Sequence, residues 1–112
     1  MTIQPDLFAS ARAARDAGMA RALDHAEAVE PRWGDVAYQA LTTFVRWYTA
    51  PGPFTSFEFR EWARPRLSAP PTDKAFGPVF VRAARAGIIR KVGYAPHPER
   101  HGSPTVLWEA VT

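Results

Sequence analysis

Apolar positions recur at helical spacing over most of the chain. The stretch from residue 6 to residue 30 is rich in Ala, Arg and Glu, and it predicts a long helix that ends before Pro31. Its apolar stripe consists mostly of Ala, which buries little area per residue, so the sequence specifies its packing only weakly. The stripe fits either packing on the rest of the domain or a surface for a dimer or another partner.

A second helix is predicted with clearer boundaries. Gly34 and Asp35 provide a turn and an N-cap, and the Pro-Gly-Pro stretch that begins at Pro51 cannot continue a helix. The apolar positions between these boundaries form one face that we expect to be buried, namely Ala37, Leu41, Phe44, Val45 and Tyr48.

The strongest local pattern is a capping box. In this motif the Thr55 hydroxyl accepts the amide of Glu58, and the Glu58 carboxylate accepts the amide of Thr55. Phe54 and Phe59 stand where a hydrophobic staple would sit. A short helix is therefore predicted over about 56–64.

A third helix is predicted with Thr72 or Asp73 as its N-cap and Gly87 as its end. Pro78 conflicts with a regular helix that starts at either cap, because it would remove a hydrogen bond inside the helix. Either the first turn is irregular, or the regular helix begins nearer Gly77 with Pro78 in its first turn. The face expected to pack in the core comprises Phe76, Phe80, Ala83 and Ala84.

The end of the chain changes to the pattern of strands. Residues 88–94 and 105–111 are rich in β-branched and aromatic side chains, and a segment with several Pro and Gly residues separates them. This predicts a hairpin with a long tip. The expected fold class is mainly α with a C-terminal β-hairpin.

Composition excludes several kinds of protein. The chain of 112 residues is the size of one domain, with 46% hydrophobic and 22% charged residues. No cysteine is present, which excludes disulfides and thiolate metal sites. No apolar run is long enough to span a bilayer and the N-terminus lacks the regions of a signal peptide, so we expect no membrane association and a cytoplasmic location.

Few residues suit catalysis. No serine lies in a nucleophile elbow, no glycine loop suits phosphate binding, and no carboxylate cluster has metal-binding spacing. We therefore expect a protein that is not an enzyme and needs no cofactor.

Basic charge gathers in the second half of the chain. Residues 1–59 carry five Arg against seven acidic residues, whereas residues 60–112 carry seven Arg and two Lys against four acidic residues. Arginine binds phosphate bidentately and stacks on bases. A GC-rich genome would produce the same preference for Arg, so composition leaves both explanations open.

The order of these elements resembles the winged helix-turn-helix family over about residues 35–111. Two segments carry the resemblance: Phe54-Thr55-Ser56-Phe57-Glu58-Phe59 at the start of the short helix, and Ala83-Ala84-Arg85-Ala86-Gly87-Ile88-Ile89-Arg90 from the third helix into the first strand. The tip, with His101-Gly102-Ser103-Pro104 before Val106-Leu107-Trp108-Glu109, is similar to small winged-helix proteins of bacteriophages and prophages. The resemblance implies a winged-helix domain over 35–112 and an N-terminal helical extension over 1–34.

The resemblance also implies a site for double-stranded DNA. In this family the third helix lies in the major groove and the wing approaches the backbone. The implied DNA-binding residues are Lys74, Arg82 and Arg85 around the third helix, Arg90, Lys91, Arg100 and His101 in the wing, and Arg60 and Arg64 on the short helix. Arg82 and Arg85 are expected to point the same way, toward the outer surface.

Alternatives remain for several of these residues. The arginines of the third helix could serve only to solvate an exposed face. His97 and His101 have an H-x3-H spacing found in zinc sites, but no cysteine or second histidine pair could complete a site, so no metal is expected. Trp33, Trp47, Trp62 and Trp108 could stack on bases but are expected to anchor the core.

The function expected from the resemblance is DNA binding by a phage or prophage protein, in DNA replication or transcription regulation. The alternative is a protein-interaction module on the same fold that docks on a replication or host component. A homodimer joined through the N-terminal helix would predict a palindromic DNA site.

Overall fold

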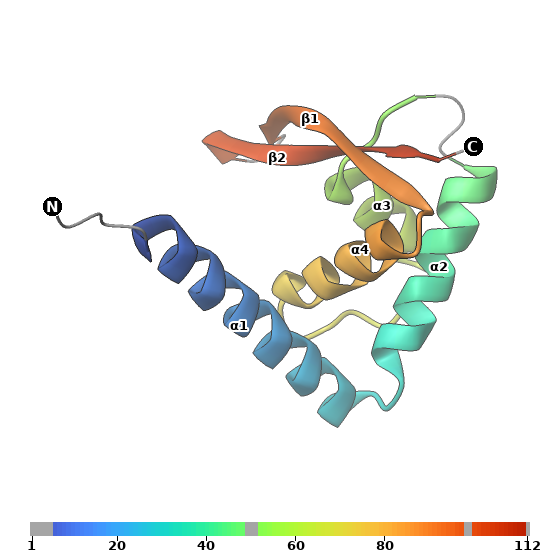
Figure 1. The fold of residues 1–112 in the computed structure, drawn as a ribbon. Coiled ribbons are helices and arrows are strands. Elements are labelled where there is room, and N and C mark those ends of the chain that lie inside the picture. Colours follow the sequence, from blue (N-terminus) through green and yellow to red (C-terminus); the bar gives the residue numbers. More distant parts are fainter. Residues whose placement is uncertain (1–5, 49–51, 98–99, 112) are drawn as a thin grey trace, which may run out of the picture.

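The protein is mainly helical and ends in a two-stranded antiparallel hairpin, as predicted (Figure 1). The computed structural model describes residues 6–48, 52–97 and 100–111, with side chains at 9–48, 52–97 and 104–111. Its elements in chain order are α1 (Asp6–Val29), α2 (Trp33–Trp47), α3 (Ser56–Ala63), the 3-10 turn η1 (Asp73–Ala75), α4 (Phe76–Arg85), β1 (Ile89–His97) and β2 (Arg100–Ala110). Among the described residues, no helix combines the length and the apolar character needed to cross a membrane.

Aromatic rings form the centre of the core. Phe59 of α3 is fully buried, and its ring centroid lies 5.5 Å from that of Phe44 on α2 and 5.7 Å from that of Phe80 on α4. The ring of Phe80 also lies 5.7 Å from that of Trp108 on β2, which brings the hairpin on to the same core. Ala83 is buried beside Phe80, so the predicted inner face of α4 is confirmed.

Helix α1 joins this core through small side chains. Ala22 and Ala26 are buried, and Met19 lies so close to Gly77 of α4 that a Cβ at that position would overlap its sulfur. The half of α1 before Met19 extends beyond the rest of the molecule (Figure 1), and residues 10–17 are all exposed. The predicted long helix is therefore present, and among its described side chains those of the second half pack against the other helices.

The predicted N-cap of α2 is wrong. The helix begins at Trp33, and Asp35 lies in its first turn. Arg32 takes the left-handed conformation at φ 66°, and the carboxylate of Glu27 accepts the amide of Gly34 at 3.1 Å. A side chain from α1 thus satisfies an amide at the start of α2, which makes a cap from Asp35 unnecessary.

The capping box of α3 is confirmed. The amide of Thr55 donates to the carboxylate of Glu58 at 3.3 Å, and the Thr55 hydroxyl donates to the other oxygen of the same carboxylate at 3.1 Å. The helix ends at Ala63, close to the predicted end.

The conflict at Pro78 is resolved by a change of helix type. Thr72 caps the short turn η1, and the regular helix α4 begins only at Phe76. Pro78 therefore lies in the first turn of α4. Backbone amides in this turn have no acceptor within the helix, so the absence of an N–H at Pro78 costs no helical hydrogen bond. Gly87, at φ 76°, follows the end of the helix as predicted.

The hairpin is longer and its tip shorter than predicted. The strands stay paired from Ile89 and Ala110 outward through Pro96 and Pro104, and the last pair joins His97 to Arg100. Two irregularities in register interrupt the pairing, and such bulges let strands continue past residues that break a regular ladder. The predicted long tip is therefore wrong.

One short bridge ties the hairpin to the segment between α2 and α3. Phe54 exchanges two backbone hydrogen bonds with Trp108, both of 2.8 Å. Phe54 therefore forms a one-residue antiparallel contact with β2, on the edge of β2 opposite β1.

Two aromatic residues of α2 that were expected in the core are exposed. Trp33 is buried, and Trp62 and Trp108 pack against the core, as predicted. Trp47 and Tyr48, however, retain 69% and 57% of their accessible surface. Trp47 is the last residue of α2 and Tyr48 is its C-cap, and both are exposed because the helical pattern continues past the end of the core.

Phe80→Ala tests the position of the aromatic core. Removing this buried ring would leave a cavity among three other aromatic rings, and we expect a loss of about 3–5 kcal/mol in the free energy of unfolding. Urea denaturation measures this loss, with Val92→Ala on the exposed side of the hairpin as the control. A loss below about 1 kcal/mol for Phe80→Ala would contradict the packing of α4.

Candidate nucleic-acid interface

Carboxylates neutralise several of the nine basic residues implicated by the resemblance. Four of them make ion pairs with carboxylates, and each pair reduces the positive charge of its region. The nine are Arg60 and Arg64 on α3, Lys74 in η1, Arg82 and Arg85 on α4, Arg90 and Lys91 on β1, and Arg100 and His101 on β2. The side chains of the last two lie outside the described part of the chain.

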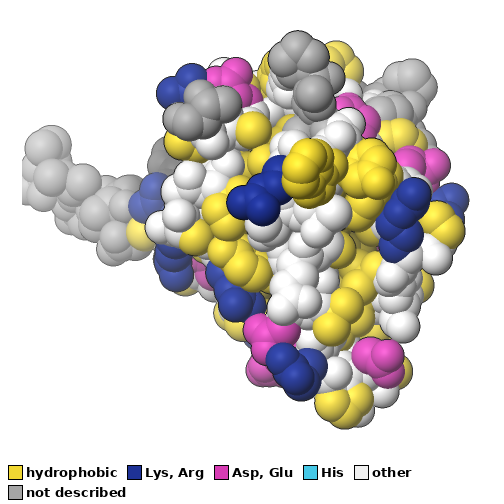
Figure 2. Space-filling model, turned by 90° about the vertical axis from the view of Figure 1, so that its right-hand side faces the viewer, with side chains coloured by type: hydrophobic (Ala, Val, Ile, Leu, Met, Phe, Trp, Pro, Cys, Tyr) yellow, Lys and Arg dark blue, Asp and Glu magenta, His cyan; other side chains and the backbone are white. Residues whose placement is uncertain are grey.

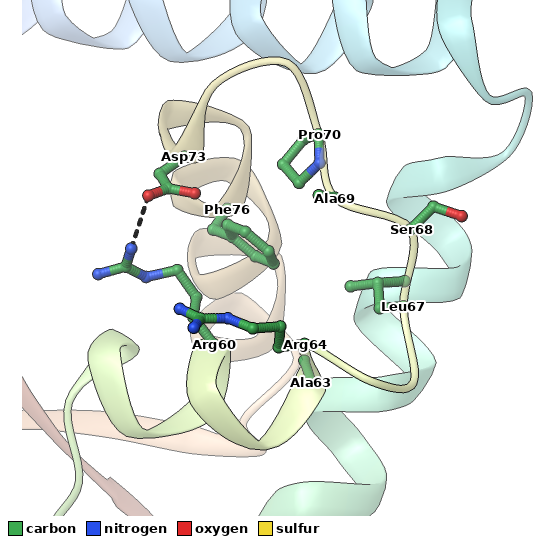
Figure 3. Close-up of a pocket in the computed structure, with 9 residues that line it drawn as sticks. All are labelled: Arg60, Ala63, Arg64, Leu67, Ser68, Ala69, Pro70, Asp73 and Phe76. Carbon is green, nitrogen blue, oxygen red and sulfur yellow. Dashed lines mark hydrogen bonds and ion pairs between the residues drawn. The ribbon is translucent and has the colours of Figure 1, made fainter.

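Arg60 and Arg64 line a common hollow of about 100 Å³ between α3 and the loop that leads to η1 (Figure 3). Arg60 donates to the carboxylate of Asp73 at 2.7 Å, and only 21% of its side chain is exposed. Arg64 pairs with Glu61 one turn earlier on the same helix. The two arginines therefore share one hollow, but their charges are balanced by neighbouring carboxylates.

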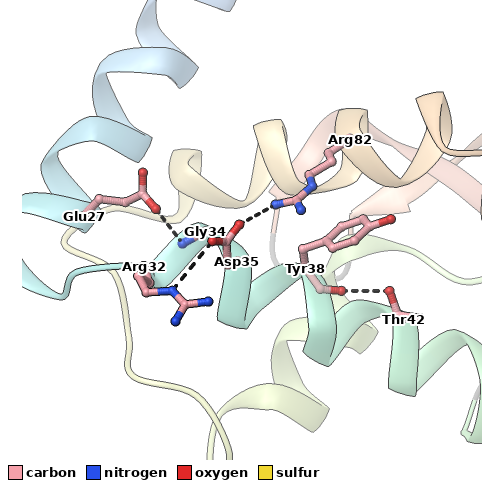
Figure 4. Close-up of polar contacts among 7 residues, drawn as sticks. All are labelled: Glu27, Arg32, Gly34, Asp35, Tyr38, Thr42 and Arg82. Atoms are coloured by element: carbon pink, nitrogen blue, oxygen red, sulfur yellow. Dashed lines mark hydrogen bonds and ion pairs between the residues drawn. The ribbon is translucent and has the colours of Figure 1, made fainter.

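Arg82 does not project freely beside Arg85, which corrects the prediction for α4. Its guanidinium turns toward α2, where it donates to Asp35 at 2.8 Å and lies 4.0 Å from the ring centroid of Tyr38 (Figure 4). About half of the Arg82 side chain stays exposed. An ion pair and a cation–π contact therefore hold it against α2.

The same pair changes the acidity of Asp35. The hydrogen bond from Arg82 lowers the pKa of this carboxyl below its usual value, and the charges of Arg82 and Arg32 act in the same direction. Because the folded pKa is lowered, the pair favours folding above the unfolded pKa and loses this effect as the pH falls through the folded pKa.

The basic residues of the first hairpin strand have partners of their own. Arg90 donates to Glu109 on the facing strand, with one bond of 2.9 Å, so this region carries little net charge. Lys91 bonds to the hydroxyl of Tyr94 and lies 4.3 Å from the centroid of its ring. Lys91 therefore retains a charge with no carboxylate beside it in the described structure.

Lys74 and Arg85, like Lys91, are candidate cations with no carboxylate partner in the described structure. Both are exposed, and neither makes an ion pair within the described residues. They lie near opposite ends of the segment formed by η1 and α4, so any ligand contacting both must run along this segment.

The sequence analysis missed two further arginines on α1. Arg12 and Arg15 precede Met19 by seven and four residues, which places them on the helix face that carries Met19, Ala22 and Ala26 into the core. Both are exposed, with no ion pair among the described side chains. Their spacing from Met19 could have shown this in the sequence, because it places the two arginines on the same helix face as the buried apolar residues.

Metal ligation has little support in the described residues. They contain no group of three or more His, Asp or Glu side chains that could hold a metal ion. The ring of His97 lies 6.1 Å from that of Phe57, while the side chain of His101 lies outside the described part.

Comparisons with known proteins add no assignment. No family model, curated protein or solved structure matches the chain.

Arg82→Gln tests the pairing of Arg82 with Asp35. Without the guanidinium, the pKa of Asp35 should rise toward its usual value, and the titration of its side-chain carboxyl carbon followed by NMR measures this change. Arg85→Gln, one turn later on the same helix, should leave the pKa of Asp35 unchanged. Equal pKa values in the wild-type and Arg82→Gln proteins would rule out the pairing.

Proposed function

We propose that the chain is a winged helix-turn-helix protein that binds double-stranded DNA without catalysing a reaction. The observation that carries this proposal is the order of elements around the hairpin. A single-residue strand contact at Phe54 falls between α2 and α3, α4 follows, and the hairpin leads directly out of α4. Three helices with a small antiparallel sheet in this order are the parts from which a winged helix is built.

In this proposal α4 is the DNA-reading helix and the hairpin is the wing. The accessible cations Lys74 and Arg85 contact DNA, and Lys91 adds a charge on the wing. Arg100 and His101 stay proposed wing contacts on the strength of the resemblance. Bases would be read by Arg85, since an arginine can bind guanine through two hydrogen bonds.

In this proposal the exposed half of α1 supplies a second set of contacts to the DNA backbone. Arg12 and Arg15 lie on the helix face that packs against α4 farther along. Figure 1 shows this half of α1 and the end of the hairpin extending to the same side of the molecule, away from α2. DNA that contacts both α1 and the hairpin would run past the start of α4, with its phosphates near Arg12 and Arg15.

The paired arginines have a smaller role. Ion pairs between exposed side chains contribute about 0–1 kcal/mol, so a phosphate could replace the carboxylate partner of Arg82 or Arg64 at little cost. Their expected contribution to affinity is nevertheless below that of cations with no carboxylate to displace.

A protein-interaction module is the second candidate. The ion pairs of Arg60, Arg82 and Arg90 favour it, because they remove positive charge from the surface that would face DNA. The resemblance to phage and prophage proteins extends either proposal to a role in replication or transcription regulation in a bacterial cell.

The DNA proposal is tested by replacing its unpaired cations. We expect wild-type protein to bind mixed-sequence duplex DNA with micromolar affinity at low salt, measured by fluorescence anisotropy. Lys74→Gln with Arg85→Gln should weaken binding at least about tenfold and reduce the salt slope by about 2, since two phosphate or base contacts are lost. Arg12→Gln with Arg15→Gln should reduce the slope similarly.

The matched control is Arg21→Gln with Arg46→Gln. This variant loses the same charge, but Arg21 lies on the opposite face of α1 from Met19, and Arg46 lies in the last turn of α2. Its affinity should stay within about twofold of wild type. Equal losses in all three double variants would indicate nonspecific charge attraction, and no binding at low salt would favour the protein-interaction candidate.

A further inference from the structure

An aromatic patch lies at the end of α2, apart from the proposed DNA contacts. We define the patch by Trp47 and Tyr48 on α2, Trp62 on α3, and the arginines Arg46 and Arg66 beside them. Figure 2 views the face formed by α2, where hydrophobic side chains gather toward one end with Lys or Arg side chains among them. Trp47 has the highest exposure, at 69%, of the large hydrophobic side chains that the structure describes.

Contacts with the core and with Arg66 position the Tyr48 and Trp62 rings of the patch. The ring centroids of Tyr48 and Trp62 are 5.1 Å apart, and Phe44 of the core lies 5.4 Å from Trp62. The guanidinium of Arg66 lies 4.6 Å from the centre of the Trp62 ring, and it donates to the carbonyl of the same residue at 2.6 Å. Tyr48 and Trp62 thus join the end of α2 to α3.

The indole of Trp62 leaves one donor unused. Its Nε1 is buried and, within the described part of the chain, has no hydrogen-bond partner. A buried N–H without an acceptor disfavours the folded state, and native proteins satisfy almost all such groups.

The charge of the patch itself is positive, because it contains Arg46 and Arg66. No acidic residue occurs between Asp35 and Glu58, and Glu61, the acid closest to Trp62 in sequence, is paired with Arg64. Arg46 is exposed without an ion pair among the described residues, and Arg66 bonds only to a backbone carbonyl and an aromatic ring. A complementary ligand therefore combines carboxylates with an apolar side chain.

We propose that this patch binds an acidic peptide segment of a protein partner, with an aromatic or aliphatic side chain of that segment against Trp47 and Tyr48 and its carboxylates on Arg46 and Arg66. Single-stranded nucleic acid fits less well, because base stacking needs rings with an open face. Arg66 covers one face of Trp62, and the Tyr48 ring is tilted by 44° against it. The proposal is independent of DNA binding, since the patch shares none of the proposed DNA contacts.

The test uses a fluorescein-labelled peptide of alternating Asp and Glu residues that carries Phe at intervals. We expect the full-length protein to bind it, as measured by anisotropy. A peptide in which Asn and Gln replace the acids, or Ala replaces Phe, should bind at least about tenfold more weakly. Trp47→Ala should weaken binding of the acidic peptide at least about tenfold, because exposed tryptophans are typical binding hot spots.

Two controls separate this site from general effects. Val36→Ala removes another exposed apolar side chain from the same face of α2, three turns away, and should leave peptide binding unchanged. Arg46→Gln with Arg66→Gln should weaken binding about fivefold more than Arg21→Gln with Arg85→Gln, which loses the same charge. Circular dichroism melting checks that the Trp47→Ala protein is folded.

Three results would overturn the proposal. The first is no binding of the acidic peptide, and the second is equal binding by the Trp47→Ala and Val36→Ala proteins. The third is binding of labelled oligothymidylate to the wild-type protein with weaker binding to the Trp47→Ala protein, since the patch would then bind nucleic acid. Oligothymidylate affinity that does not differ between Trp47→Ala and Val36→Ala supports the peptide assignment.

Discussion

The packing around the ring of Phe59 fixes how the rest of the molecule is arranged. This ring lies between Phe44 of α2 and two rings of α4, Phe76 and Phe80, so it sets the rotation of α4 about its own axis. Phe80 in turn contacts Trp108 and positions the hairpin. Because these contacts hold one side of α4 inside, the basic residues of its other side reach the surface.

Carboxylates from elsewhere in the chain then decide which of those basic residues are accessible. Asp35 holds Arg82 against α2, and Asp73 holds Arg60 at the edge of α3. Such exposed pairs add little to stability, but they lower the local positive potential that a polyanion would meet. The surface charge available for DNA therefore depends on a few cations without such partners, Arg85 among them.

Sequence reasoning succeeded where the determining interactions are local. The capping box was predicted, and the first-turn position of Pro78 was one of two alternatives; both depend on neighbours within one or two turns. It failed where two helices meet: the carboxylate of Glu27 on α1 accepts the amide of Gly34 on α2, and Arg82 of α4 pairs with Asp35 of α2. No periodicity along one helix contains these contacts, because they depend on how two helices are placed side by side. The exposed last turn of α2 was missed because the apolar pattern extends beyond the core that it packs on.

We propose that DNA contacts α1, α4 and the hairpin while the end of α2 stays free. The most direct measurement is a titration of isotope-labelled protein with a mixed-sequence duplex, followed by NMR. We expect chemical-shift changes at Arg12, Arg15, Lys74 and Arg85 and along the hairpin, with Trp47 unaffected. Changes confined to the region of Trp47, or no changes with excess duplex at low salt, would contradict it.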